Sequence, residues 1–171
     1  MQISEQEKQE LEALYQKLKA DPLILKMKEI PMHRGSNCYI HSFKVTKYAV
    51  KRALKKKKTY NLKDVIVGCV LHDYYLYDWR VEHDKRKKHG SQHPLIAEKN
   101  AKRDFNISPE VSEIIKTHMW PINLKQYPHS KEAKLVDFAD DVIATIEFLS
   151  CKRHKKKKES VYYKYIETLF D

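Results

Sequence analysis

The chain has 171 residues, of which 42% are hydrophobic and 33% are charged, and this balance excludes general disorder and favours one globular domain. Its formal net charge is +11, and it contains only three glycines and six prolines. A chain so poor in turn residues is unsuited to many short strands, which excludes an all-β sandwich or barrel. Composition therefore predicts a single domain that is not all-β, and the helical patterns along the chain predict an all-α fold.

The predicted helices follow one another along the chain with few long connections. Residues 5–19 repeat leucines at helical spacing, and Ser36 is a plausible N-cap for a helix that runs to about residue 55. Residues 61–71 are apolar nearly all round, which predicts the central buried helix. Residues 74–90 are expected to be irregular, and later helices are expected at 93–104, 108–118, 131–151 and 159–170. We expect three parts: an N-terminal helical extension (1–30), a central domain (31–150) and a C-terminal helix packing on the same domain (151–171).

The cysteines and the apolar runs indicate the cellular compartment in which the protein is expected. Cys38, Cys69 and Cys151 lie far apart and form no CxxC pair, so neither a disulfide framework nor a zinc finger is expected. The first residues lack the apolar core of a signal peptide, and the longest apolar run is too short to cross a bilayer. We therefore expect a soluble, cytoplasmic protein without a membrane partner. The sequence carries no signal for an oligomeric state.

The positive charge is concentrated in two tracts, residues 55–58 and 152–158. Neither tract interleaves aromatic residues, and no DNA-binding motif accompanies them. The favoured interpretation is two solvated helix ends or loops, with nucleic acid as a less favoured partner. An anionic small molecule would also be attracted by this charge.

The most informative polar residues are His72 and Asp73, which end the most apolar helix. Burying either group without a partner costs several kcal/mol. A divalent cation would satisfy both, although a simple helix C-cap would also explain the histidine. The pair alone leaves both interpretations open.

Other candidate ligands lie on the neighbouring predicted helices. His41 falls in the first turns of the helix after Ser36, and His118 ends the helix 108–118. Asp140 lies at the border of an expected apolar arc, whereas Asp137 and Asp141 are expected to point further into solvent. The members of that arc are Leu135, Val136, Phe138, Ala139, Val142, Ile143 and Ile146.

The order His41, His72-Asp73, Asp140 resembles the H…HD…D signature of the HD superfamily of metal-dependent phosphohydrolases. Residues 33–45 resemble its first histidine motif, and three further blocks resemble those of a bacterial subgroup. These are an HD…YDW block at 71–79, an HG..HP block at 89–94 and an HMWP block at 118–121. The resemblance covers residues 31–150. Asp141 departs from it, because the subgroup usually has lysine there.

The resemblance implies a helical HD fold with one or two divalent metal ions. The implied ligands of the first ion are His41, His72, Asp73 and Asp140. A second ion would be held by His93 and His118, with Asp73 bridging the two. The metal could be manganese, iron, cobalt, nickel, zinc or magnesium. Metal-activated water makes His72 and Asp73 the expected catalytic residues.

Further residues near these motifs are candidates for contacts with substrate. His33 and His89 are expected to line the same site, and Arg34 is a candidate for a phosphate contact. Lys44 and Arg80 are also candidates, although each is more readily explained as a surface cation.

The expected function is hydrolysis of a phosphoester in a nucleotide or another small phosphorylated metabolite. The first alternative is a metal- and nucleotide-binding HD module that regulates a partner without turnover. The second is a nucleic-acid-binding helical protein with a structural metal site.

Overall fold

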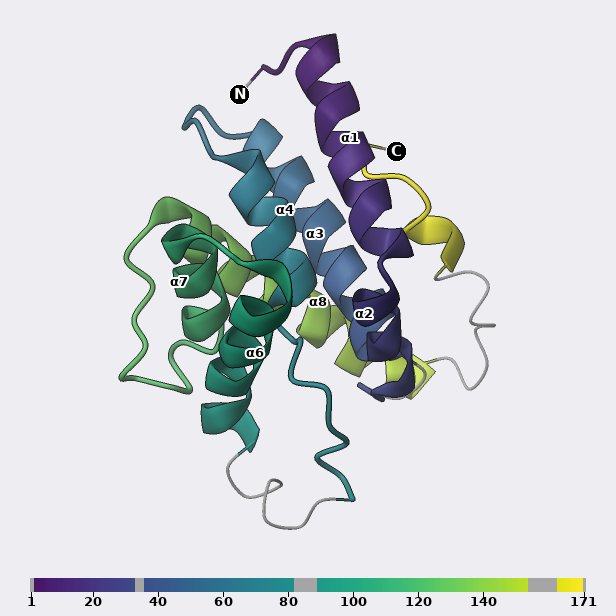
Figure 1. The fold of residues 1–171 in the computed structure, drawn as a ribbon, viewed down its shortest axis with the longest axis vertical. Helices are drawn as coiled ribbons and strands as arrows, with labels where there is room; N and C mark the ends of the chain where they lie inside the picture. Colours follow the sequence, from purple (N-terminus) through teal and green to yellow (C-terminus); the bar gives the residue numbers. More distant parts are fainter. Residues whose placement is uncertain (1, 33–35, 82–88, 154–162, 171) are drawn as a thin grey trace.

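The computed structural model describes residues 2–32, 36–81, 89–153 and 163–170 (Figure 1). Within these ranges every regular element is a helix, which confirms the all-α fold, and Pro31 and Asn37 form one isolated β-bridge. None of the helices described is long and apolar enough to span a membrane. In chain order the elements are α1 (Glu5–Ala20), α2 (Pro22–Leu25), η1 (Lys26–Glu29), α3 (Cys38–Leu54), α4 (Leu62–Leu71), α6 (His89–Phe105), α7 (Pro109–Thr117) and α8 (Lys131–Arg153).

Polar side chains cap several helices where the sequence predicts it. Asn61, Ser108 and Ser130 each accept a hydrogen bond from a backbone N–H in the first turn of α4, α7 and α8, at 3.3, 3.1 and 3.1 Å. The expected cap of α3 is wrong by one residue. Asn37 accepts from the Ile40 N–H at 2.9 Å, and the Ser36 hydroxyl is directed elsewhere.

Helix α6 begins four residues earlier than expected, at His89 instead of His93. The prediction placed Pro94 in the first turn, where proline is tolerated best, but Pro94 lies inside the helix. The helix continues past it because Ala97 and Ala101 are fully buried on the same element. Packing therefore outweighs the single backbone hydrogen bond that proline removes.

Helix α4 is the centre of the molecule, as its composition predicts. It packs against α1, α3, α6, α7 and α8. Gly68 permits the close approach of α7, because a Cβ atom at this position would lie 2.6 Å from Cγ2 of Ile114 in α7. The ends of α4 and α7 are thereby held side by side.

The buried face of α8 differs from the expected arc. Phe138 and Ile146 are 40% and 50% exposed, and the Arg52 guanidinium lies 4.0 Å from the centre of the Phe138 ring. Asp137, which was expected in solvent, is 7% exposed, and its carboxylate accepts from the Trp120 N–H at 3.2 Å. The stripe that faces inward includes Val136, Asp140 and Ile143. Carboxylates can lie on this inner face because nitrogen donors meet them there.

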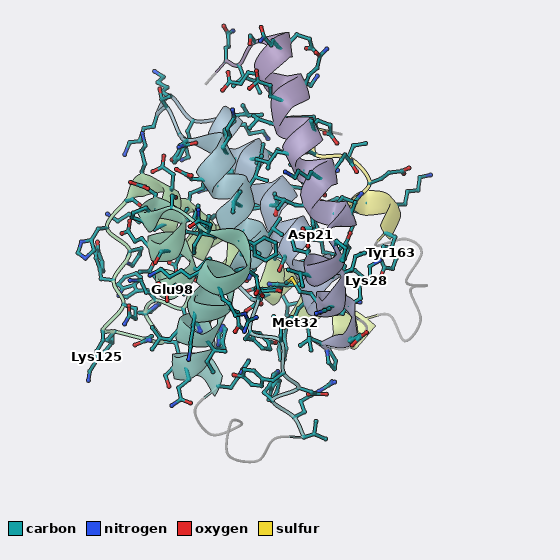
Figure 2. All side chains as sticks on the ribbon, in the orientation of Figure 1. Asp21, Lys28, Met32, Glu98, Lys125 and Tyr163 are labelled. Atoms are coloured by element: carbon teal, nitrogen blue, oxygen red, sulfur yellow. The ribbon has the colours of Figure 1, made fainter. Side chains whose placement is uncertain are left out.

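The last described residues, 163–170, lie along α1 (Figure 1). The Tyr15 hydroxyl donates to the Ile166 carbonyl at 2.9 Å, and the Leu169 N–H donates to Glu12 at 2.9 Å. Lys28 and Tyr163 meet at the edge of this contact, with 5.4 Å between Nζ and the ring centroid (Figure 2). Of the expected helix 159–170, residues 163–165 are helical, and residues 159–162 lie outside the described part. The division into 1–30, 31–150 and 151–171 stays a prediction.

Candidate metal centre

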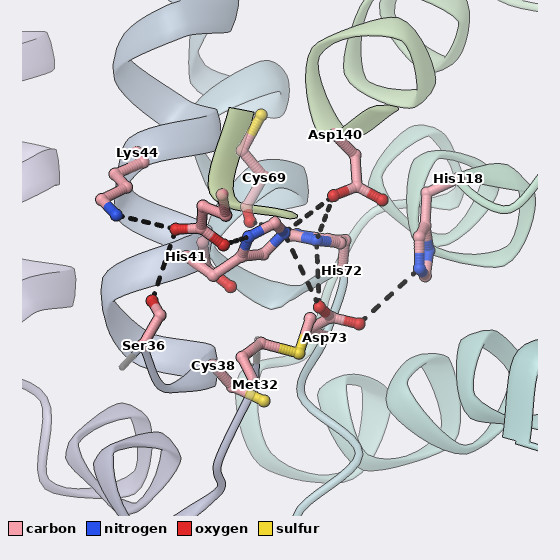
Figure 3. A network of polar contacts seen from close by, with 12 residues as sticks. Met32, Ser36, Cys38, His41, Lys44, Cys69, His72, Asp73, His118 and Asp140 are labelled. Carbon is pink, nitrogen blue, oxygen red and sulfur yellow. Dashed lines mark hydrogen bonds and ion pairs between the residues drawn. The ribbon is translucent and has the colours of Figure 1, made fainter. Parts of the chain in front are cut away.

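Helices α3, α4, α6, α7 and α8 bring six buried polar side chains together. Figure 3 labels His41, His72, Asp73, His118 and Asp140 among them. Helix α3 contributes its fourth residue, α4 the two residues that follow it, α6 a residue of its second turn, α7 its C-cap and α8 a mid-helix acid. Donor atoms within 4.8 Å of one another define three overlapping groups that suit a metal ion. The groups are His41, His72 and Asp73; His72, His118 and Asp140; and Asp73, His93 and His118. All six side chains expected to be ligands therefore meet in one place.

The two aspartates link the groups. Asp140 Oδ1 lies 2.8 Å from Nε2 of His41 and 3.5 Å from Nε2 of His72. Asp73 uses its oxygens separately: Oδ2 lies 3.3 Å from Nε2 of His72, and Oδ1 lies 3.3 Å from Nε2 of His93. Asp73 thus stands between the side of the centre near α3 and the side near α6 and α7.

Three of the imidazoles are oriented by backbone carbonyls. Nδ1 of His72 donates to the Cys69 carbonyl at 2.7 Å, and Nδ1 of His118 donates to the Ile115 carbonyl at 2.7 Å. These carbonyls lie in the last turns of α4 and α7, where no helical N–H follows to pair with them. Nδ1 of His93 donates to the His89 carbonyl at 2.8 Å. Each of these rings therefore directs Nε2 at the centre, where it offers a lone pair whenever the ring is neutral.

A cation would satisfy the Nε2 atoms that point into the centre. Among the described residues, Nε2 of His72 has no hydrogen-bond partner, although it is fully buried. Nε2 of His93 faces Nε2 of His118 at 2.9 Å, which sets two lone pairs against each other when both Nδ1 atoms are protonated. Imidazole nitrogen with carboxylate oxygen is a donor set that suits first-row transition metals. The residues present therefore fit a divalent metal ion.

The charges of the centre agree with this fit. Burial opposes ionisation of Asp73, but His72 and His93 hold the pKa of its carboxyl well below its usual value. Burial likewise opposes ionisation of Asp140, and His72 and His41 lower its pKa strongly. Burial, together with neighbouring His72 and His93, lowers the pKa of His118 to about 3. Burial opposes charging of His41 and His72, but the neighbouring carboxylates raise the pKa of His41 to about 9 and that of His72 well above its usual value. The centre thus pairs ionised carboxylates with positive charge, and a bound cation would take the place of the histidine protons.

His89 lies beside the centre, not in it. Its ring stacks between Trp79 and His93, with centroid separations of 5.1 and 4.6 Å. The Tyr77 hydroxyl and Nδ1 of His89 are hydrogen-bonded at 2.9 Å. Burial, followed by the charge of His93, lowers the pKa of His89 to about 4, so this ring is neutral. The geometry is compatible with the expected contact to substrate, which stays a prediction.

The structure gives less information about the other candidates for substrate binding. His33 and Arg34 lie outside the described residues. Arg80 is exposed at the surface and pairs with Asp78, with 3.2 Å between Nε and Oδ1. Lys44 is directed at a carboxylate within the fold.

That carboxylate belongs to Glu147, which the sequence analysis did not identify. Its Oε2 accepts from Nδ1 of His41 at 2.9 Å, and its Oε1 accepts from Lys44 at 2.7 Å and from Ser36 at 3.3 Å (Figure 3). Glu147 follows Asp140 by seven residues, a spacing that places both on one face of α8. The seven-residue spacing from Asp140 could therefore have identified Glu147, but the exposed apolar neighbours of Glu147 obscured it.

Comparison with known proteins addresses the family. No curated protein and no solved structure gives a significant match to the chain. A family model described as HD domain matches residues 38–145, from the first residue of α3 to the middle of α8. This match spans more than half of the chain and contains all six clustered side chains, so the protein belongs to the HD domain family.

Proposed function

We propose that this protein is a metal-dependent phosphohydrolase that cleaves a phosphoester of a nucleotide or another small phosphorylated metabolite with metal-activated water. HD domains bind divalent metals and are commonly hydrolases. The observation that carries the proposal is the buried, unpartnered Nε2 of His72 among carboxylates and further imidazoles.

The residues that would hold metal fall into two sets that share Asp73. His41, His72, Asp73 and Asp140 would hold one ion, and Asp73, His93 and His118 would hold a second. A bound ion of this kind lowers the pKa of water and polarises a phosphoryl oxygen.

The protein's own groups around the centre suit an anionic substrate. The Tyr77 hydroxyl lies 2.9 Å from Nδ1 of His89, and when it donates to that nitrogen the ring proton of His89 resides on Nε2, where it can donate to a phosphoryl oxygen. Burial raises the pKa of the Cys38 and Cys69 thiols well above the usual value, so neither is suited to act as a nucleophile. The net charge of +11 attracts phosphorylated molecules.

The test combines elemental analysis with a substrate screen. Protein purified without chelator or a metal-affinity tag is compared with Asp73→Ala and with His129→Ala, a control at an exposed position. We expect stoichiometric transition metal in the wild type and the control, together with hydrolysis of at least one nucleotide or small phosphoester. Both properties should be lost in Asp73→Ala.

Two outcomes would contradict the proposal in different ways. Bound metal without turnover of any phosphoester would favour a regulatory module that binds metal and nucleotide. Absence of metal, with no uptake of added manganese or iron, would contradict the metal centre itself.

A further inference from the structure

His41 is held differently from the other imidazoles of the centre. His72, His93 and His118 each donate Nδ1–H to a carbonyl three or four residues earlier in their own chain segment. His41 instead directs Nδ1 at the Glu147 carboxylate of α8. The residue that orients this ring is therefore supplied by a distant part of the chain.

The position of His41 accounts for its difference from His72 and His118, which lie at the ends of their helices. It is the fourth residue of α3, and its own N–H already donates to the Asn37 carbonyl at 3.0 Å. Carbonyls near the start of a helix accept the N–H groups of the next turn, whereas those at the end remain open. The ends of α4 and α7 offer open carbonyls to His72 and His118, but α3 offers none of this kind to His41.

Two carboxylates of helix α8 contact the two nitrogens of the His41 ring. Asp140 lies 2.8 Å from Nε2, and Glu147 lies 2.9 Å from Nδ1. Seven residues span two turns, or about 10 Å along the axis, which leaves room for an imidazole between two carboxylates on one helix face. One element thus sets the orientation of the ring at both nitrogens.

The second oxygen of Glu147 is also occupied. Lys44 donates to Oε1 at 2.7 Å and Ser36 donates to it at 3.3 Å, while the Glu147 side chain is 7% exposed. A buried carboxylate with a cation on one oxygen remains available as an acceptor on the other. Lys44 therefore balances the charge of Glu147 and leaves Oε2 for the ring.

We infer that Glu147, with Lys44 as its counterion, is the positioning residue that fixes His41 as the Nδ1–H tautomer and so keeps Nε2 available to a metal ion. This inference rests on the metal-binding part of the proposed function. It assigns to α8 a second role beside the one carried by Asp140.

The experiment measures zinc affinity and the state of the His41 ring. Zn²⁺ is the probe because it is diamagnetic, and its Kd is measured by calorimetry for wild type, Glu147→Gln, Glu147→Ala and Lys44→Met. The His41 Nδ1–H is followed by ¹⁵N NMR of the zinc-loaded proteins. Glu98→Gln is the matched control, because Glu98 also accepts from a lysine and a serine, at 2.6 Å each, but contacts no histidine.

We expect Glu147→Ala to weaken zinc binding by about 10- to 100-fold, the usual effect of losing an outer partner of a histidine ligand. The slowly exchanging Nδ1–H signal of His41 should disappear in that variant. Glu147→Gln keeps an acceptor oxygen without the charge, so both effects should be smaller. Glu98→Gln should change neither quantity.

A merely structural role would give a different pattern. An unchanged zinc Kd with a retained His41 Nδ1–H signal in folded Glu147→Ala would overturn the inference. Should Glu147→Ala fail to fold, the same unchanged values in Glu147→Gln and Lys44→Met would overturn it. A wild type that binds no zinc would overturn both this inference and the metal centre, whereas zinc binding without any hydrolysis would contradict only the proposed activity.

Discussion

Asp137 and Asp140 lie one helical turn apart, are both nearly buried, and have opposite environments. Asp140 is surrounded by imidazoles, whereas Asp137 accepts one backbone N–H and lies near the further acid Asp141. Burial, then the charge of Asp141, raises the pKa of Asp137 to about 7, while the histidines lower that of Asp140. Only Asp140 is therefore suited to hold a cation at neutral pH.

We expect the two acids to differ in metal binding. Asp140→Asn should weaken metal affinity by more than the roughly 100-fold associated with losing an outer partner. Asp137→Asn should leave affinity nearly unchanged, because its amide oxygen still accepts from the Trp120 N–H and no imidazole contacts it directly. Calorimetric titration with Mn²⁺ at pH 7 measures both, and equal losses would show that Asp137 belongs to the centre.

The raised pKa of Asp137 also predicts how stability depends on pH. In the folded protein its pKa is about 7, against an ordinary value of 3.8. Between these values the folded state binds the proton and the unfolded state does not, so stability falls as pH rises. Asp137→Asn lacks this loss, and its stability relative to the metal-free wild type should increase from pH 4 to pH 8. Urea denaturation across that range measures the difference, and a constant difference would contradict the raised pKa.

Residue types singled out most of the clustered side chains but missed the groups that support them. His72 and Asp73 stood out because a polar pair follows an apolar helix. His41, His118 and Asp140 were candidates by their places on neighbouring helices, and His93 followed from the family resemblance. Glu147 and the burial of Asp137 were not foreseen, because a carboxylate on α8 is buried only if donors from other helices meet it. Those donors, His41 and the Trp120 N–H, are distant in sequence.

At the scale of elements, the C-terminal ends of α4 and α7 both lie at the centre. His72 and His118 are the C-caps of α4 and α7, and the rings of these two residues meet edge to face with centroids 4.8 Å apart. Gly68, one turn before His72, lets the two helices approach closely. Local capping chemistry predicted the starts of these helices, but their mutual distance depends on a single missing side chain.

We expect Gly68→Ala to destabilise the fold. The new Cβ would lie 2.6 Å from Cγ2 of Ile114, and overpacking of this kind costs about 1–3 kcal/mol. Gly90→Ala is the control, because its Cβ would meet Ile122 at an ordinary 3.8 Å. Thermal unfolding of both variants compares the two positions. Equal stability of Gly68→Ala and the control would mean that α4 and α7 adjust without penalty.

At the scale of the whole molecule, the last described segment packs against the first helix. Residues 163–170 lie against the side of α1 that carries Glu12, Tyr15 and Gln16, whose side chains hydrogen-bond to the segment. Hydropathy predicted a C-terminal element on the same core, but not that it would lie on α1. That placement depends on hydrogen bonds from α1 side chains to backbone carbonyls of the segment, which leave no mark in a hydropathy pattern.

We expect Ile166→Ala to lower the free energy of unfolding by about 2–5 kcal/mol, because this side chain is fully buried. Tyr165→Ala, at a position that is 50% exposed, should change it by no more than about 1 kcal/mol. Neither change should alter metal affinity at a temperature where the variant is folded. Chemical denaturation and metal titration test the two statements separately.

The contribution of α8 has a consequence for the order in which the protein matures during synthesis. A chain emerging from the ribosome exposes His41 first, then His72 and Asp73, and only much later the helix that carries Asp140 and Glu147. Until α8 has emerged, His41 lacks the two carboxylates, Asp140 and Glu147, that meet its nitrogens in the folded protein. The nascent protein therefore cannot complete the set that contains His41 and Asp140 before α8 has left the ribosome, and metal loading of that set follows the synthesis of α8 instead of guiding it.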